Sequence, residues 1–168
     1  LAFGANALAD KSNSFVVGSS AQACGVNAGA IGAAASANGA NSIALGVNSY
    51  AKRDSSLALG TSANASGTNA TAIAINASAN GANSLAAGVS TSATGSNSTA
   101  FAAFASASGD NSVALGVQAR ASNTSAMAFG TDSTASGANA TAFSANAAAS
   151  GANAMAFGVQ SNASGANA

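Results

Sequence analysis

The side chains that could do chemistry are few and scattered in this sequence. Its 168 residues include no His and no Glu, and four basic residues are balanced by four Asp. The acidic and thiol groups are far apart along the chain, and they offer no acid–base or nucleophile–base pair; they are Asp10, Cys24, Asp54, Asp110 and Asp132. The Gly-Gly-x-Gly-x-Asp motif of calcium-binding solenoids is absent as well. We therefore expect no enzyme activity, no metal site and no cofactor.

Binding by exposed side chains is the better supported chemistry. A formal net charge of zero gives no basic footprint for nucleic acid. A few aromatic and basic residues interrupt segments rich in Ser, Asn and Ala, and such residues are enriched at the energetic centres of interfaces. We call them the candidate ligand surface: Tyr50, Lys52, Arg53, Phe104 and Arg120. The alternative is that isolated exceptions on a long surface are neutral.

A strict internal period must position these residues. With Asn41 as repeat position 1, the chain divides into 14-residue units without insertion or deletion, and twelve such units account for 168 residues. Position 1 is Asn in ten units and Ser in two, at Ser55 and Ser125. Position 4 is Ala in every unit except at Val16, and position 11 is always Ala. Position 5 is large and apolar in every unit except at Ala87.

The repeat predicts an all-β parallel solenoid of twelve rungs, each with two short strands. Gly at positions 6 and 13 would cost a helix about 1 kcal/mol each relative to Ala, and Asn and Ser favour turns. Positions 2–6 and 8–12 alternate as strands do. Gly at position 13 and Asn at position 1 supply turn residues that tolerate positive φ, and stacked Asn side chains predict an amide ladder.

Small residues indicate which side of each strand faces inward. On the second strand, Ala at positions 9 and 11 alternates with polar residues, so Ala is expected inside. On the first strand, either the large residues at positions 3 and 5 fill the interior, or Ala at position 4 does and the roll is very flat. The constancy of position 4 favours the flat roll, because overpacking a tight interior is destabilising. The predicted roll interior includes Ala44, Ala58, Ala114, Ala51, Ala65 and Ala121.

A flat roll leaves its large apolar side chains outside. Twelve rungs spaced about 4.8 Å apart would form an apolar stripe roughly 58 Å long, more than a monomer normally exposes. We therefore predict a homo-oligomer, with position 3 contributing less regularly because three rungs carry Thr there. The oligomer core is expected to contain Phe3, Leu45, Leu59, Ile73, Phe101, Leu115, Phe129, Phe143 and Phe157.

The repeat resembles that of YadA-like heads of trimeric autotransporter adhesins. The best matches are Asn-Ser-Ile-Ala-Leu-Gly at residues 41–46 and Asn-Ser-Val-Ala-Leu-Gly at 111–116, and the resemblance covers all twelve units. It implies a left-handed parallel β-roll, a homotrimer, and a place on the surface of a Gram-negative bacterium, anchored in the outer membrane. It further implies adhesion to host matrix proteins such as collagen, to host cells, and possibly to other copies of itself.

Some features depart from the family pattern. Ala74, Ala102 and Ser144 replace Gly at position 6, and Gly29 stands where a large residue is expected; we expect looser packing there with the register preserved. No neck, coiled-coil stalk or membrane anchor is recognisable, so residues 1–168 are expected to be one head domain cut from a longer chain.

Two other functions fit a repetitive solenoid. One is a passive spacer or fibre segment. The other is an ice-binding solenoid, but Thr recurs irregularly here, without the two-column array that an ice-binding surface needs.

Overall fold

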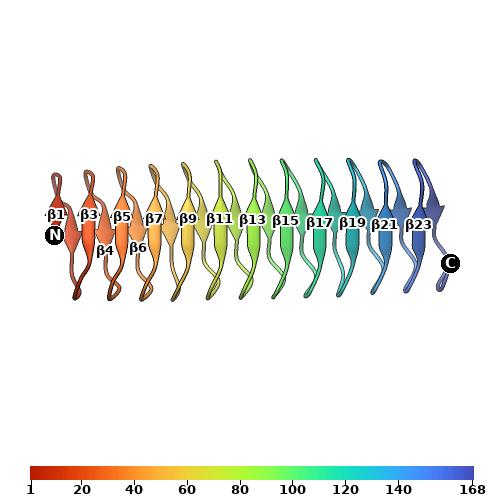
Figure 1. Ribbon diagram of the computed structural model, residues 1–168, viewed down its shortest axis with the longest axis horizontal. Helices are drawn as coiled ribbons and strands as arrows, with labels where there is room; N and C mark the ends of the chain where they lie inside the picture. The colour runs from red at the N-terminus through yellow and green to blue at the C-terminus, as the bar shows by residue number, and fades with distance from the viewer.

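The computed structural model describes all 168 residues as a stack of rungs that runs from the N-terminus at one end to the C-terminus at the other (Figure 1). There is no helix, and each 14-residue repeat contributes one strand to each of two twelve-stranded parallel sheets. The predicted all-β parallel solenoid with two strands per rung is confirmed.

The first sheet is formed by the odd-numbered strands, which pair in sequence order. They are β1 (Ala2–Phe3), β3 (Phe15–Val17), β5 (Gly29–Ile31), β7 (Ile43–Leu45), β9 (Leu57–Leu59), β11 (Thr71–Ile73), β13 (Leu85–Ala87), β15 (Thr99–Phe101), β17 (Val113–Leu115), β19 (Met127–Phe129), β21 (Thr141–Phe143) and β23 (Met155–Phe157).

The second sheet is formed by the even-numbered strands, again in sequence order. They are β2 (Leu8–Ala9), β4 (Gln22–Ala23), β6 (Ser36–Ala37), β8 (Tyr50–Ala51), β10 (Asn64–Ala65), β12 (Ser78–Ala79), β14 (Ser92–Ala93), β16 (Ser106–Ala107), β18 (Arg120–Ala121), β20 (Thr134–Ala135), β22 (Ala148–Ala149) and β24 (Asn162–Ala163).

The strands are shorter than predicted, covering positions 3–5 and 10–11 of the repeat. The first strand ends where the backbone turns to positive φ at position 6, and the corners contain further positive φ values at positions 8 and 1. Each rung has two such corners. In one of them, Asn48 has a φ of +56° and the Ser49 N–H donates to the Gly46 carbonyl, which closes a β-turn. Asn tolerates this conformation better than most residues, which accounts for its recurrence at positions 8 and 1.

The interior consists almost entirely of alanine. The core cluster contains 34 buried hydrophobic residues, and all of them are Ala except Val16. On β7, Ala44 is fully buried, whereas Ile43 and Leu45 are 44% and 37% exposed. The hypothesis that large residues of the first strand fill the interior is therefore wrong. Two sheets that meet almost entirely through methyl groups leave little room for side chains larger than that of Val16.

The two recurrent glycines have different causes. Gly46, at position 6, has a φ of +139°, a conformation that favours glycine. Gly81, at position 13, has no positive φ, so the tolerance of positive φ noted for this glycine does not explain it. Instead, a Cβ on Gly81 would lie 1.9 Å from the Gly95 carbonyl oxygen of the next rung. Close rung-to-rung approach therefore favours glycine at position 13.

The predicted amide ladder is present along position 1. The Nδ2 of each Asn donates to the Oδ1 of the Asn on the next rung at 3.0–3.2 Å. The ladder stops at Ser55 and Ser125, which lack the amide. Its three runs are Asn13–Asn27–Asn41, Asn69–Asn83–Asn97–Asn111 and Asn139–Asn153–Asn167.

The departures from the repeat keep the register, as predicted. At Gly29, however, the packing is not loosened in the way a missing side chain would suggest. Gly29 is buried, and a Cβ there would lie 2.4 Å from the ring of Phe15, its register partner on β3. The Phe15 ring therefore occupies the space that a side chain at position 29 would need.

Replacing Ser144 with Gly is expected to stabilise the fold. Ser144 has a φ of +133° at a position where nine rungs carry Gly, and such strain costs on the order of 1–3 kcal/mol. Ser144→Gly should therefore raise the free energy of unfolding by about 1 kcal/mol or more, measured by denaturant unfolding at one protein concentration. Ser150→Gly is the control, because Ser150 is exposed and has no positive φ. A control as stabilising as Ser144→Gly would argue against strain at position 6.

Candidate interaction surfaces

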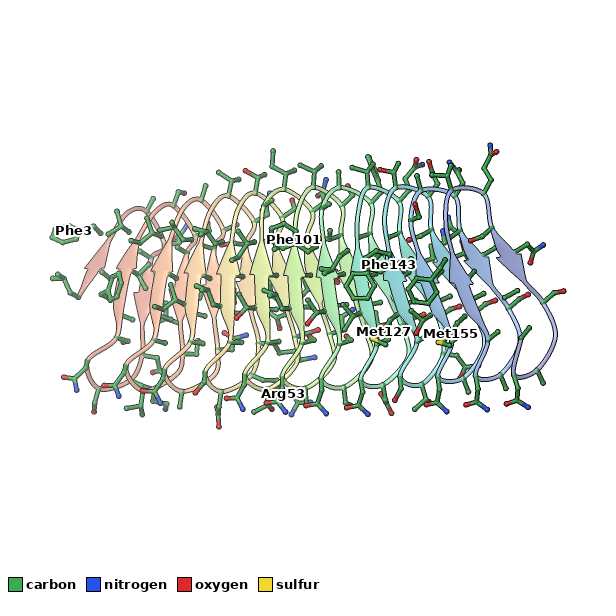
Figure 2. All side chains as sticks on the ribbon, turned by 45° about the vertical axis from the view of Figure 1, so that its right-hand side comes forward. Phe3, Arg53, Phe101, Met127, Phe143 and Met155 are labelled. Atoms are coloured by element: carbon green, nitrogen blue, oxygen red, sulfur yellow. The ribbon has the colours of Figure 1, made fainter.

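The two sheets present outer faces of opposite character. Positions 3 and 5 point outward from the first sheet and form what we call the apolar stripe. Phe3, Phe101 and Phe143 lie at intervals along the length of the stack (Figure 2). Positions 10 and 12 point outward from the second sheet and form the polar face, which carries mostly Ser, Asn and Thr. One flat scaffold thus offers a surface suited to an apolar partner and another suited to water.

The residues predicted for the oligomer core all lie on the apolar stripe. In the single chain Phe101 is 56% exposed and Phe157 is 62% exposed. Near the C-terminal end, the ring centroids of Phe129 and Phe143 are 5.6 Å apart and those of Phe143 and Phe157 are 5.7 Å apart. The remaining predicted residues are exposed or half-buried: Phe3, Leu45, Leu59, Ile73 and Leu115.

The residues predicted for the roll interior occupy the core on both sheets. None of the six has any exposed surface: Ala44, Ala58, Ala114, Ala51, Ala65 and Ala121.

Buried serines at the corners are a feature that the sequence did not point to. Positions 2 and 9 hold either Ala or a hydroxyl residue, and except at Ser112 the hydroxyl donates to a carbonyl three residues earlier. Ser42 Oγ donates to the Gly39 carbonyl at 2.7 Å, and Ser49 Oγ donates to the Gly46 carbonyl at 2.8 Å. Both serines are fully buried. The signal was the restriction of both positions to small residues.

The candidate ligand surface divides into two groups on the polar face. Tyr50 and Arg120 both occupy position 10, five rungs apart, which corresponds to about 24 Å at 4.8 Å per rung. Lys52 and Arg53 belong to the rung of Tyr50, and Phe104 lies near Arg120. The structure thus separates the five predicted residues into a Tyr50 group and a Phe104–Arg120 group.

In the Tyr50 group, Tyr50 is half-buried, the two basic side chains are open to solvent, and few contacts hold the group in place. Lys52 and Arg53 are exposed, and Arg53 lies at the lower edge of the stack in Figure 2. The Tyr50 hydroxyl accepts a long hydrogen bond of 3.5 Å from Asn38 Nδ2. Neither basic side chain forms an ion pair. Both cations are therefore free to contact a ligand.

Two of the carboxylates accept hydrogen bonds from backbone N–H groups. Asp54 Oδ1 accepts from the Ala40 N–H at 2.9 Å, and Asp110 Oδ1 accepts from the Ser96 N–H at 2.8 Å. In both cases the donor belongs to the preceding rung at the same repeat position. These two carboxylates thus tie neighbouring rungs together at this corner.

The other ionisable groups form no larger constellation. The one ion pair joins Lys11 Nζ to Asp10 at 3.1 Å, and Cys24 is half-buried and unpaired. No three His, Cys, Asp or Glu residues lie close enough to share a metal ion. No helix is present that could cross a membrane.

Comparison with known proteins agrees with the repeat architecture. Comparison with curated proteins gives no match. A model of the YadA head domain repeat, spanning two copies of the repeat, matches segments from one end of the chain to the other. The matched residues are 1–21, 25–49, 54–73, 79–101, 107–132, 121–147 and 149–168. Matches over most of the chain, on a parallel solenoid of the same period, establish that it belongs to the YadA head domain repeat family.

Proposed function

We propose that residues 1–168 form one head segment of a homotrimeric adhesin on a bacterial surface, held at the outer membrane in the full-length protein. Family membership suggests an adhesin-like, surface-exposed protein and implies trimeric assembly. Repeats of this family and solenoids of this kind are non-enzymatic in nature. In our proposal the roll is left-handed, three apolar stripes pack together at the trimer core, and the three polar faces remain outside.

The apolar stripe is the single observation that carries this proposal. Its side chains continue from Phe3 to Phe157, and many of them are more than a third exposed in the single chain. Monomers seldom expose contiguous apolar patches above a few hundred Å². Burial of the stripe against identical stripes removes this surface from water, which stabilises the assembly by about 25 cal/mol per Å² of apolar surface buried.

The polar face is proposed to contact the host. Three copies of a repetitive face multiply weak contacts by avidity, which suits a fibrous partner such as collagen or another matrix protein. The same avidity would serve attachment to host cells or to other copies of the head.

Adhesion is tested by binding to immobilised collagen, fibronectin and laminin. We expect the chain to bind at least one of them at micromolar concentration, and Tyr50→Ser with Arg53→Gly to weaken that binding about tenfold, because aromatic and Arg side chains dominate interface energies. Both replacements introduce residues that other rungs carry at the same positions, so the fold should tolerate them. An unchanged affinity would remove the Tyr50 group from the proposal. Absence of binding to all three proteins would favour a passive spacer.

A further inference from the structure

The polar face contains one groove, of about 500 Å³, in an otherwise flat array of small residues. It spans three consecutive rungs and is built by a single chain. Its lining consists of Phe104, Ser106, Ser108, Arg120, Ser122 and Thr134. This volume lies within the range of roughly 300–1,000 Å³ that is usual for small-ligand sites.

The groove exists because two rungs carry unusually large side chains. Ser106, Arg120 and Thr134 are register partners on β16, β18 and β20, so Arg120 rises between two short side chains. Phe104, 58% exposed, stands on the corner before β16. Other rungs carry Ser at the same positions, as at Ser90 and Ser92. The aromatic ring and the guanidinium therefore form walls around a floor of small residues.

The polar groups of the groove have no hydrogen-bond partner within the chain. No side-chain hydrogen bond is formed by the hydroxyl of Ser106, Ser108, Ser122 or Thr134. On the same two columns outside the groove, some polar side chains bond to one another: Ser36 Oγ bonds to Asn38 Oδ1, and Ser66 Oγ bonds to Asn80 Oδ1. Four hydroxyls are thus available as donors and acceptors for a ligand.

Arg120 is likewise unengaged. Its guanidinium forms no ion pair, although Asp110 and Asp132 belong to nearby rungs. The Asp110 carboxylate accepts the Ser96 N–H, and Asp132 stands exposed on the corner before β20. Neither acid lines the groove. A free guanidinium presents paired N–H donors that match a planar carboxylate or a sulfate.

The geometry points to a binding site for an acidic sugar, a saccharide unit that carries a carboxylate or a sulfate. The C–H face of a sugar ring packs against the electron-rich face of an aromatic ring such as that of Phe104. Sugar hydroxyls both donate and accept, as the four hydroxyls of the floor do. Arg120 pairs with the anionic substituent. A neutral sugar would leave the guanidinium unused, and a simple anion would leave the ring and the floor unused.

This site rests on the proposed function, since it gives the adhesin head a glycan as its partner on the polar face. The groove does not depend on the trimer, because one chain supplies every lining residue. A monomer that binds acidic sugars would contradict the proposed assembly alone. A trimer that adheres to matrix proteins and binds no acidic sugar would contradict the sugar site alone.

The test compares three sugars that share one core: lactose, 3′-sialyllactose and lactose 3′-sulfate. Ligand-observed NMR titrations give a dissociation constant for each. We expect at least one acidic sugar to bind about tenfold or more tightly than lactose, because bonds to a charged group are the stronger ones. The preferred sugar then identifies the anion as carboxylate or sulfate. Equal binding of all three, or no binding up to about 10 mM, would overturn the proposal.

Variants place the binding in the groove. Arg120→Ser and Phe104→Ser each introduce the residue of other rungs, and each should weaken binding of the preferred sugar about tenfold or more. Lys11→Gly is the control: it removes a single positive charge seven to eight rungs away, at a position where most rungs carry Gly, and it should leave the affinity unchanged. An equal loss in Lys11→Gly and Arg120→Ser would indicate general attraction to basic charge and would overturn the site.

Discussion

Replacing Ala114 with Leu is expected to destabilise the chain by about 3 kcal/mol or more, at the upper end of the usual overpacking range. Ala114 lies on β17 with no exposed surface, between alanines of the neighbouring rungs and opposite the alanines of the second sheet. A leucine there has no space unless the two sheets separate, and separation would strain the corners on both sides. Denaturant unfolding of the two proteins at equal concentration measures the loss.

Thr99→Leu is the matched control for this substitution. Thr99 belongs to β15 of the same sheet but points outward at position 3, where Leu57 and Leu85 already occur in other rungs. It should cost far less than Ala114→Leu, because the stripe already carries leucine at this position in other rungs. If both leucines were equally tolerated, the interior would not be the thin alanine layer described here.

Replacing Phe101 with Asp is expected to convert the proposed trimer to monomers without unfolding the chain. Phe101 is 56% exposed in the single chain, so the fold loses little packing. In the trimer, three carboxylates would be buried close together, where desolvation and mutual repulsion are not compensated by any cation. Sedimentation equilibrium should then give a mass of 15.4 kDa.

Phe104→Asp provides the control away from the apolar stripe. Phe104 is 58% exposed, slightly more than Phe101, and another rung carries Asp132 at the same repeat position. This variant should keep the mass of the unsubstituted protein. Dissociation of both variants would mean that the contact between chains is not made by the apolar stripe.

The sequence predicts the architecture well because its period is unbroken. Each residue repeats an environment met fourteen residues earlier, so the pairing of Ala44 with Ala58 follows from spacing alone. The interior was also predictable, since repeat position 4, which includes Ala44, stays Ala in all but one rung while the large neighbours at positions 3 and 5 vary. The shortening of the strands was not, because it depends on backbone angles at the corners, which Asn, Ser and even Phe104 adopt.

The causes behind individual residues were harder to predict from their type. Gly46 and Gly81 are both glycines, but for different reasons. Gly46 has a positive φ, whereas at Gly81 the next rung approaches too closely for a side chain. The backbone role of Asp54 depends on a free N–H at Ala40, which the spacing does not reveal. The two groups of the candidate ligand surface follow from the period. The groove beside Arg120 does not, because it depends on the bulk of side chains in three adjacent rungs.

The solution mass of the unsubstituted chain is the most direct test of the proposed assembly. Sedimentation equilibrium over a range of concentrations should give about 46 kDa, three times the 15.4 kDa of one chain. The proposed trimer should persist on dilution, because the apolar stripe is buried only when the chains associate. A mass of 15.4 kDa at all concentrations would mean that a single chain tolerates the exposed stripe, and it would contradict the trimeric adhesin head.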